Sequence, residues 1–225
     1  MQKDFLPGGA LPVDNGDEII PVLNDYIRRF KDATANVLAS RDWHPPNHVS
    51  FKSQGGLWPP HCVQQTLGAR FSPALKLPDH TTIISKATNP ELEAYSAFDG
   101  TSLAHDLLAL GVERLFIGGL ATDYCVLNTV LDAIKLGFET VVLMDATLGI
   151  NVELGDVDRA IETMLKNGAQ QASAEDFPDA IDELSTEKLQ HDVLAEKPSL
   201  RAEIKKKARM RSKGSARQIR TERKG

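Results

Sequence analysis

Short apolar runs alternate along the chain with longer segments in which apolar residues recur at helical spacing. The short runs lack polar alternation, which is typical of parallel strands covered on both faces. We expect strands over 35–39, 81–85, 114–119, 140–144 and 169–173. The periodic segments predict helices over 16–32, 101–110, 123–136, 156–167 and 179–195. This order predicts an α/β fold of three layers, with helices on both faces of a mostly parallel central sheet.

Polar side chains follow three of the predicted strands. Asp42 and His44 come after the first strand, Lys86 after the second and Cys125 after the third. Ligands of parallel sheets gather at the carboxyl ends of the strands, so these residues are candidates for one site. The loop over 44–77 is rich in Pro, Gly and His, and a connection of that length is usually functional.

The composition is that of a globular protein. The chain has 225 residues, of which 41% are apolar and 25% are charged, which excludes wholesale disorder and collagen-like repeats. No apolar run approaches the ~20 residues that a spanning helix needs, so we expect no membrane residence. The N-terminus lacks a signal-peptide pattern. Two cysteines, Cys62 and Cys125, provide no disulfide framework, and we therefore expect a cytoplasmic protein.

Charge divides the chain into an acidic body and a basic tail. Residues 197–225 hold 12 of the 26 lysines and arginines but 2 of the 31 acidic residues. This tail lacks a core-forming pattern, so we expect it to be disordered, after a folded domain over 1–178 and a helical extension over 179–196. Such a tail binds nucleic acid or an acidic partner, or it is a solvated appendage.

Cys125 and Lys86 are the candidates for covalent chemistry. Cys125 lies in the first turn of a predicted helix, where free amide groups favour a thiolate and stabilise an oxyanion. Its alternative is a small buried apolar side chain. Lys86 ends an apolar strand, where a lysine either reaches solvent or supplies a cation to a site. Beside Cys125 it would lower the pKa of the thiol.

Metal ligands and ring-stacking residues are also present in the loops. Asp42 and His44 form an Asp-x-His pair, and His48 and His61 follow in the same loop. Such ligands suit Zn²⁺, Mn²⁺ or Fe²⁺, although an Asp-x-His pair is also frequent by chance. Three loop aromatics could stack on a flat ligand or could cover the core, namely Phe5, Trp58 and Tyr95.

Five segments together resemble the nicotinamidase/pyrazinamidase branch of the isochorismatase-like cysteine hydrolases. They are QKDFLPGGALPV at 2–13, SRDWHPPNHVSF at 40–51, WPPHCVQQTLGA at 58–69, KATNPELEAYSAFDGT at 86–101 and GGLATDYCVLNT at 118–129. The resemblance covers about residues 1–178. It implies an αβα fold around a parallel sheet of about six strands, and hydrolysis of nicotinamide to nicotinate and ammonia in pyridine-nucleotide salvage.

The resemblance also implies a role for each candidate. Cys125 would be the nucleophile and Lys86 its charged neighbour. The implied ligands of a divalent metal, with Zn²⁺ ahead of Mn²⁺ or Fe²⁺, are Asp42, His44 and His61, with His48 as a further ligand or supporting group. A cis peptide is implied at Leu120–Ala121, with the Ala121 and Cys125 amides facing the oxyanion. The implied ring pocket consists of Phe5, Trp58 and Tyr95.

The sequence departs from the family's pattern at its start. The family's first strand ends in an Asp-hydrophobic-Gln triplet whose aspartate is the general base. Met1 and Gln2 align with the last two positions, so the aspartate would precede Met1, and the first strand would be missing as well. We expect the 225-residue chain to have poor activity, and a longer parent to be an active amidase.

Several alternatives remain open from the sequence. The same Cys–Lys pair could hydrolyse another small amide or carbamoyl compound. Cleavage of a vinyl ether is less favoured because it leaves Cys125 without a purpose. The chain could also be an inactive homologue whose basic tail binds nucleic acid. The exposed faces of such folds favour a homo-oligomer.

Overall fold

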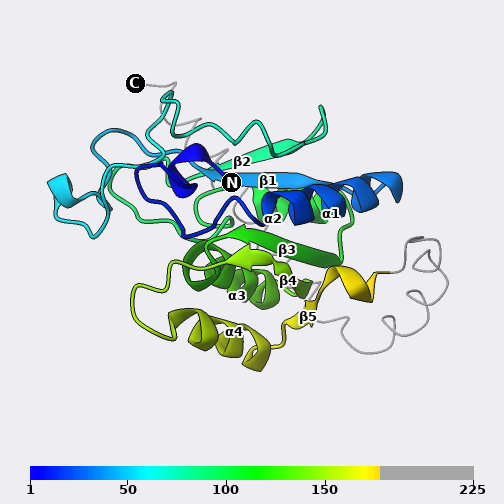
Figure 1. Ribbon diagram of the computed structural model, residues 1–225. Helices are drawn as coiled ribbons and strands as arrows, with labels where there is room; N and C mark the ends of the chain where they lie inside the picture. Colours follow the sequence, from blue (N-terminus) through cyan, green and yellow to red (C-terminus); the bar gives the residue numbers. More distant parts are fainter. Residues whose placement is uncertain (178–225) are drawn as a thin grey trace, which may run out of the picture. The chain divides into compact units, whose positions relative to one another are not determined.

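The computed structural model of the chain describes residues 1–177, in which five strands pair in parallel (Figure 1). Strand β1 (Leu38–Asp42) pairs with β2 (Thr82–Lys86), and β4 (Glu139–Leu148) pairs with β3 (Arg114–Leu120) and β5 (Gln170–Ala172). The helices are α1 (Ile20–Asp32), α2 (Leu103–Ala109), α3 (Leu127–Lys135) and α4 (Asp156–Lys166). The predicted helix over 179–195, the extension over 179–196 and the tail over 197–225 lie outside the described residues.

The first strand begins later than predicted. The pattern favoured a strand over 35–39, but β1 spans Leu38–Asp42. Residues before Leu38 belong to the turn that ends α1. In this turn the Ala35 amide donates to the Phe30 carbonyl at 2.8 Å, and Thr34 adopts a left-handed φ of 56°. This is a common way to terminate a helix, and it delays the return to extended backbone.

Alternate residues of β4 place helices on opposite faces of the sheet. Val142 packs in a cluster with Val130 of α3 and Met164 of α4. Leu143, the next residue, packs with Tyr26 of α1 and with Phe177. Because successive strand residues point to opposite faces, α1 lies on one face and α3 and α4 on the other. The predicted three-layer α/β fold is confirmed.

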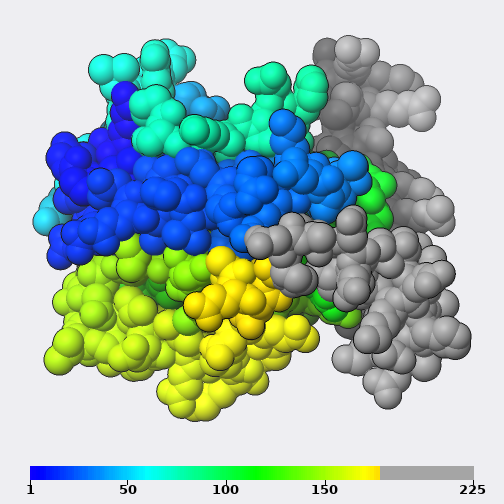
Figure 2. Space-filling model, turned by 45° about the vertical axis from the view of Figure 1, so that its right-hand side comes forward, coloured from blue at the N-terminus to red at the C-terminus, as the bar shows by residue number. Residues whose placement is uncertain are grey.

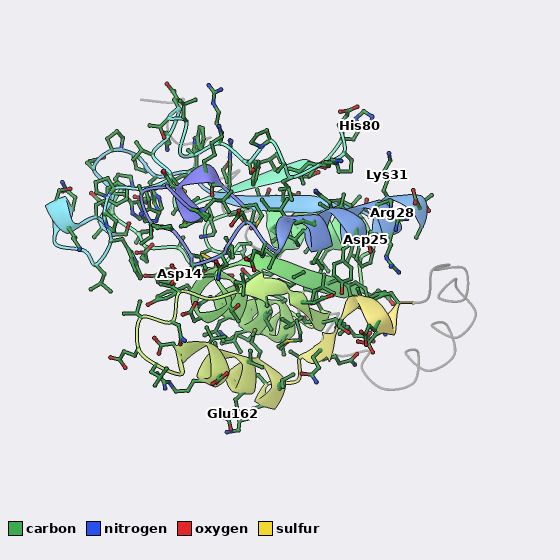
Figure 3. All side chains as sticks on the ribbon, viewed as in Figure 1. Asp14, Asp25, Arg28, Lys31, His80 and Glu162 are labelled. Atoms are coloured by element: carbon green, nitrogen blue, oxygen red, sulfur yellow. The ribbon has the colours of Figure 1, made fainter. Side chains whose placement is uncertain are left out.

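Helix α1 is joined by hydrogen bonds to Asp145 of β4 and to Phe177. Figure 2 shows the blue surface of α1 meeting the yellow surface of residues 170–177. The Tyr26 hydroxyl donates to Asp145 at 2.8 Å, and the Arg29 guanidinium donates to the Phe177 carbonyl at 2.9 Å. On the outer side of α1, Asp25 and Arg28 form an exposed ion pair (Figure 3). This helix therefore divides into a packed face and a charged face, as its periodicity predicts.

The strands form two sheets, whereas the sequence predicted one central sheet. Within residues 1–177, β1 pairs only with β2, and β3 pairs only with β4. The two sheets share one core, since Leu38 and Ile84 pack in the same cluster as Leu115 and Ile117. No strand among residues 1–177 joins the edges of β1 and β3, and the sequence had indicated that the first strand of the family's sheet would be missing.

The side chain of Gln2 occupies the unpaired edge of β1. The Trp43 amide donates to the Lys86 carbonyl, so the backbone groups of Asp42 point away from β2. There the Gln2 carboxamide donates to the Asp42 carbonyl at 2.7 Å and accepts from the Asp42 amide at 2.8 Å. One buried side chain thus makes both hydrogen bonds that a neighbouring strand would make.

No helix among residues 1–177 combines the length and the apolar character needed to cross a bilayer.

We expect Met164→Ala to lower the free energy of unfolding by about 2–5 kcal/mol, because truncation of a fully buried side chain leaves a cavity. The matched control is Leu165→Ala on the same helix, where the side chain is 37% exposed and the loss should be below about 1 kcal/mol. Urea unfolding measures both variants. Equal losses would show that α4 does not pack as described.

Candidate active site

The carboxyl ends of β1, β2 and β3 meet at one pocket. Asp42 and Lys86 end β1 and β2 and lie opposite each other in the register. The π-helix Thr122–Val126, which contains Cys125, begins two residues after β3 ends. All three side chains line one pocket. The structure thus brings together the polar residues that the sequence placed at strand ends.

Lys86 is the charged centre of the pocket and is 4% exposed. Its ammonium group forms an ion pair with one carboxylate oxygen of Asp42 and donates to the Ala94 carbonyl at 2.9 Å. Its third contact is the Cys125 sulfur, at 3.3 Å. Burial alone would lower the pKa of Lys86, but Asp42 and Cys125 raise it above its ordinary value. The lysine therefore remains charged at neutral pH.

The thiol of Cys125 belongs to a partly buried residue that lines the pocket. Burial raises the pKa of Cys125 above its ordinary value, and the neighbouring Lys86 opposes that rise. The turn before Cys125 is fixed at its first residue, where the Thr122 and Thr147 hydroxyls lie 2.8 Å apart. The Thr147 hydroxyl in turn donates to the Gly119 carbonyl at 2.9 Å. The resting thiol is therefore protonated and firmly placed.

Asp42 lies between Lys86 and His61 and interacts with both. Burial would raise the pKa of Asp42, but the Lys86 ammonium group and His44 hold it below its ordinary value. One carboxylate oxygen contacts Lys86, and the other lies 3.8 Å from Nε2 of His61. The carboxylate is therefore ionised and keeps one oxygen directed toward the histidines.

The ring orientations of His44 and His61 leave their Nε2 atoms free for a metal ion. Nδ1 of His44 lies 3.0 Å from the His61 carbonyl, and Nδ1 of His61 lies 2.8 Å from the Pro59 carbonyl. A carbonyl only accepts, so each Nδ1 carries the proton and each Nε2 offers a lone pair. Burial also lowers the pKa of His44 to about 4, so its ring is neutral at pH 7.

Asp42, His44 and His61 therefore fit a divalent metal ion. Their ligand atoms lie within 4.8 Å of one another, and all three residues are buried. Two imidazoles and a carboxylate suit a borderline cation and leave further coordination positions for water or substrate.

His48 is bound differently from the other two histidines. Its Nε2 lies 3.0 Å from the Leu92 carbonyl and must carry a proton, while its Nδ1 accepts from the Ser50 amide at 3.2 Å. A second group of ligand atoms, from His44, His48 and Glu93, also lies within 4.8 Å. Both nitrogens of His48 are engaged, however, so this geometry assigns it a supporting position.

Aromatic rings form one wall of the pocket. The Trp58 indole donates to the Tyr95 hydroxyl at 3.0 Å, and both rings pack against Tyr124, at centroid distances of 5.1 and 5.5 Å. Phe5 also lines the pocket and packs against His61 at 5.5 Å. The three predicted aromatics therefore lie in one pocket.

The backbone beside Cys125 has the predicted cis peptide at Leu120–Ala121. Ala121 lines the same pocket as Cys125. Two further histidines of the described residues, His80 and His105, lie elsewhere. His105 is exposed on α2, and Figure 3 shows His80 near the start of β2.

Comparison with known proteins agrees with this geometry. A model of the isochorismatase domain matches residues 1–176. The chain belongs to the isochorismatase family.

Its relatives include nicotinamidases and pyrazinamidases. The nicotinamidase of Escherichia coli is 38% identical over 190 residues, which cover 75% of this chain and 89% of that protein. The nicotinamidase of Acinetobacter baylyi is 36% identical, with coverages of 77% and 89%. Among solved structures, the pyrazinamidase of Pyrococcus horikoshii in complex with zinc has 54% sequence identity and a TM-score of 0.74, and the match covers 77% of this chain and 94% of that one.

Sequence reasoning missed three features of this isochorismatase-family pocket. It did not single out Tyr124, although the residue directly precedes Cys125, or Glu93, which lines the pocket from the loop after β2. It also assigned Asp42 to a metal and Lys86 to the thiol without pairing them. Their common position at the ends of two parallel strands is the signal that could have revealed this pair.

We expect His44→Ala and His61→Ala each to weaken binding of a divalent metal ion, probed with zinc, more than about 100-fold, because each would remove a ligand rather than its support. His48→Ala should weaken it less, by about 10-fold, because that side chain is held by Ser50 and Leu92. Competition with a chromophoric chelator measures the affinities.

His105→Ala is the matched control, since its side chain is 77% exposed, and its affinity should equal that of the wild type. A loss for His48→Ala as large as that for His44→Ala would contradict the supporting position.

Proposed function

We propose that this chain hydrolyses nicotinamide to nicotinate and ammonia, in cytoplasmic salvage of pyridine nucleotides. The observation that carries the proposal is the 3.3 Å contact between Lys86 Nζ and Cys125 Sγ, in a pocket shared with a metal-binding triad. The similarity to nicotinamidases of two bacteria supports the substrate.

The substrate ring binds between the aromatic wall and the triad. Trp58, Tyr95 and Tyr124 supply flat apolar surface for a pyridine ring. Asp42, His44 and His61 would hold a divalent ion, which we propose to be zinc because the Pyrococcus horikoshii structure contains zinc, and this ion would supply a Lewis acid for the ring heteroatom. Manganese and iron are the alternatives for these ligands. The ring orientation sets the amide carbon against Cys125.

Cys125 acts as the nucleophile, and Lys86 supports it. Because burial raises the pKa of the thiol, a base must remove its proton before attack. The sulfur then bonds to the amide carbon, and the positive charge of Lys86 stabilises the thiolate on the way. The amides of Ala121 and Cys125 hold the oxyanion. The C–N bond breaks as the proton from the thiol passes to nitrogen, and ammonia leaves.

Hydrolysis of the thioester completes the cycle. A water molecule attacks the acyl carbon, the C–S bond breaks, and nicotinate leaves while the thiol regains a proton. Both halves of the reaction need a group that takes up a proton and returns it. The carboxylates that line the pocket among residues 1–177 are Asp42 and Glu93. Asp42 is already paired with Lys86, so it is a poor base.

We propose that a further parallel strand, ending in an aspartate, supplies this base between β1 and β3. The unpaired edges of these strands support the proposal. So does Gln2, which binds the edge of β1 at Asp42, where a strand leading into Met1 would end. The carboxylate would then lie beside Cys125 and Lys86.

We expect Cys125→Ser to reduce ammonia release from nicotinamide by roughly 10³-fold or more, because the hydroxyl is a far weaker nucleophile in this setting. Cys62→Ala is the matched control, since burial raises the pKa of the Cys62 thiol and keeps it inert. The control should retain the wild-type rate. A Cys125→Ser chain as active as the wild type would refute the thioester route.

We expect a chain extended before Met1 by an apolar strand ending in Asp to release ammonia about 10²–10⁴-fold faster than the 225-residue chain, which is the usual contribution of general acid–base catalysis. The matched control ends the same strand in Asn, and it should restore pairing without the proton transfer. Equal rates for all three chains would show that an aspartate ahead of Met1 is not the base.

A further inference from the structure

A carboxylate next to the nucleophile binds a loop that contributes Ile150 to the pocket wall. Asp123 lies two residues before Cys125, in the π-helix. Its Oδ1 accepts from the Ile150 amide at 3.0 Å, and its Oδ2 accepts from the Asn151 amide at 2.7 Å. Both oxygens of one side chain are thus used on two successive amides of the loop over 149–155.

This loop has little apolar packing of its own to hold it. Val152 is 61% exposed and Leu154 is 93% exposed. Asn151 adopts a left-handed φ of 57°, and its side chain accepts from the Val157 amide at 3.4 Å. Polar contacts rather than burial therefore hold the loop in place. The two hydrogen bonds to Asp123 connect the loop to the turn that carries Cys125.

The loop backbone at Gly149 lies close to the Asp123 side chain. A Cβ atom on Gly149 would lie 2.9 Å from Oδ1 of Asp123 and 2.2 Å from a methyl group of Val157. Only glycine leaves room for this contact. Ile150, the next residue, lines the same pocket as Tyr124 and Cys125. Asp123 thereby connects the thiol on one side of the pocket to an apolar wall residue on the other.

We propose that Asp123 is a positioning residue that sets the distance between the nucleophile and the Ile150 wall, and so determines how tightly a ring-bearing amide binds. The proposal rests on the proposed function for its substrate, nicotinamide. It does not require Asp123 to touch that substrate. The turn itself has other supports, from Thr147 to Thr122 and from Asn128 to the Tyr124 carbonyl at 2.8 Å, so loss of Asp123 should free the wall and leave the thiol in place.

The test uses the metal-loaded full chain and follows alkylation of Cys125 by iodoacetamide, quantified on the Cys125 peptide by mass spectrometry. The variants are Asp123→Ala, Asp123→Asn and the control Asp132→Ala, which removes the same charge from an exposed ion pair with Lys135 on α3. For Asp123→Ala we expect an unchanged alkylation rate without ligand. The nicotinamide concentration that gives half-protection should rise about tenfold, equivalent to about 1.4 kcal/mol.

Asp123→Asn keeps one acceptor oxygen and should give an intermediate rise, whereas Asp132→Ala should match the wild type. Hydrogen exchange at the Ile150 and Asn151 amides should be faster in Asp123→Ala. Unchanged half-protection with unchanged exchange would overturn the proposal, as would an equal rise in the Asp132→Ala control. If Asp123→Ala does not fold, Asp123→Asn decides by the same two measurements.

The two proposals fail in different ways. If nicotinamide does not protect Cys125 of the wild type, the proposed substrate is wrong, and the exchange measurement alone decides the anchoring by Asp123. If nicotinamide protects the wild type and Asp123→Asn equally and exchange does not change, the proposed function stands and the positioning role is lost.

Discussion

The buried ammonium group of Lys86 is the constraint on which this structure depends. A charge at 4% exposure must be paired and hydrogen-bonded, because its desolvation otherwise costs several kcal/mol. Asp42 on β1, the Ala94 carbonyl and the Cys125 thiol meet that need from three separate segments. The lysine therefore brings the ends of two sheets to one point. The same requirement that stabilises the charge also places a cation beside a thiol.

The two sheets position the residues of the site at the carboxyl ends of their strands. β1 and β2 carry the charged pair at their carboxyl ends, and β3 leads into the turn that holds Cys125. The shared cluster of Leu38, Ile84, Leu115 and Ile117 joins the two sheets through apolar packing. The Gln2 side chain satisfies the unpaired edge of β1 directly at Asp42. Strand pairing, apolar packing between the sheets and the Gln2 carboxamide together hold Asp42, which lies between Lys86 and the histidines.

Much of the fold could be predicted from local pattern, and each failure has an identifiable physical cause. The predicted strands overlap all five observed ones, and β3 and β4 in particular follow apolar runs, as strands covered on both faces do. The start of β1 was misplaced because the turn after α1 is closed by Thr34 and Ala35, which the apolar pattern does not reveal. The division of the strands into two sheets was not predicted, because strand pairing joins residues far apart in sequence. Tyr124 and Glu93 were missed for the same reason, since pocket lining is a property of space.

The sequence by itself determined the family resemblance, the residues capable of chemistry and their places at strand ends, because motif spacing and apolar periodicity are local properties. Only the tertiary structure decided how those residues are paired and protonated. The carbonyls of His61 and Pro59 select the tautomers of His44 and His61, while Ser50 and Leu92 occupy both nitrogens of His48. Such differences among similar histidines arise from hydrogen bonds and burial that folding creates, so no one-dimensional pattern contains them.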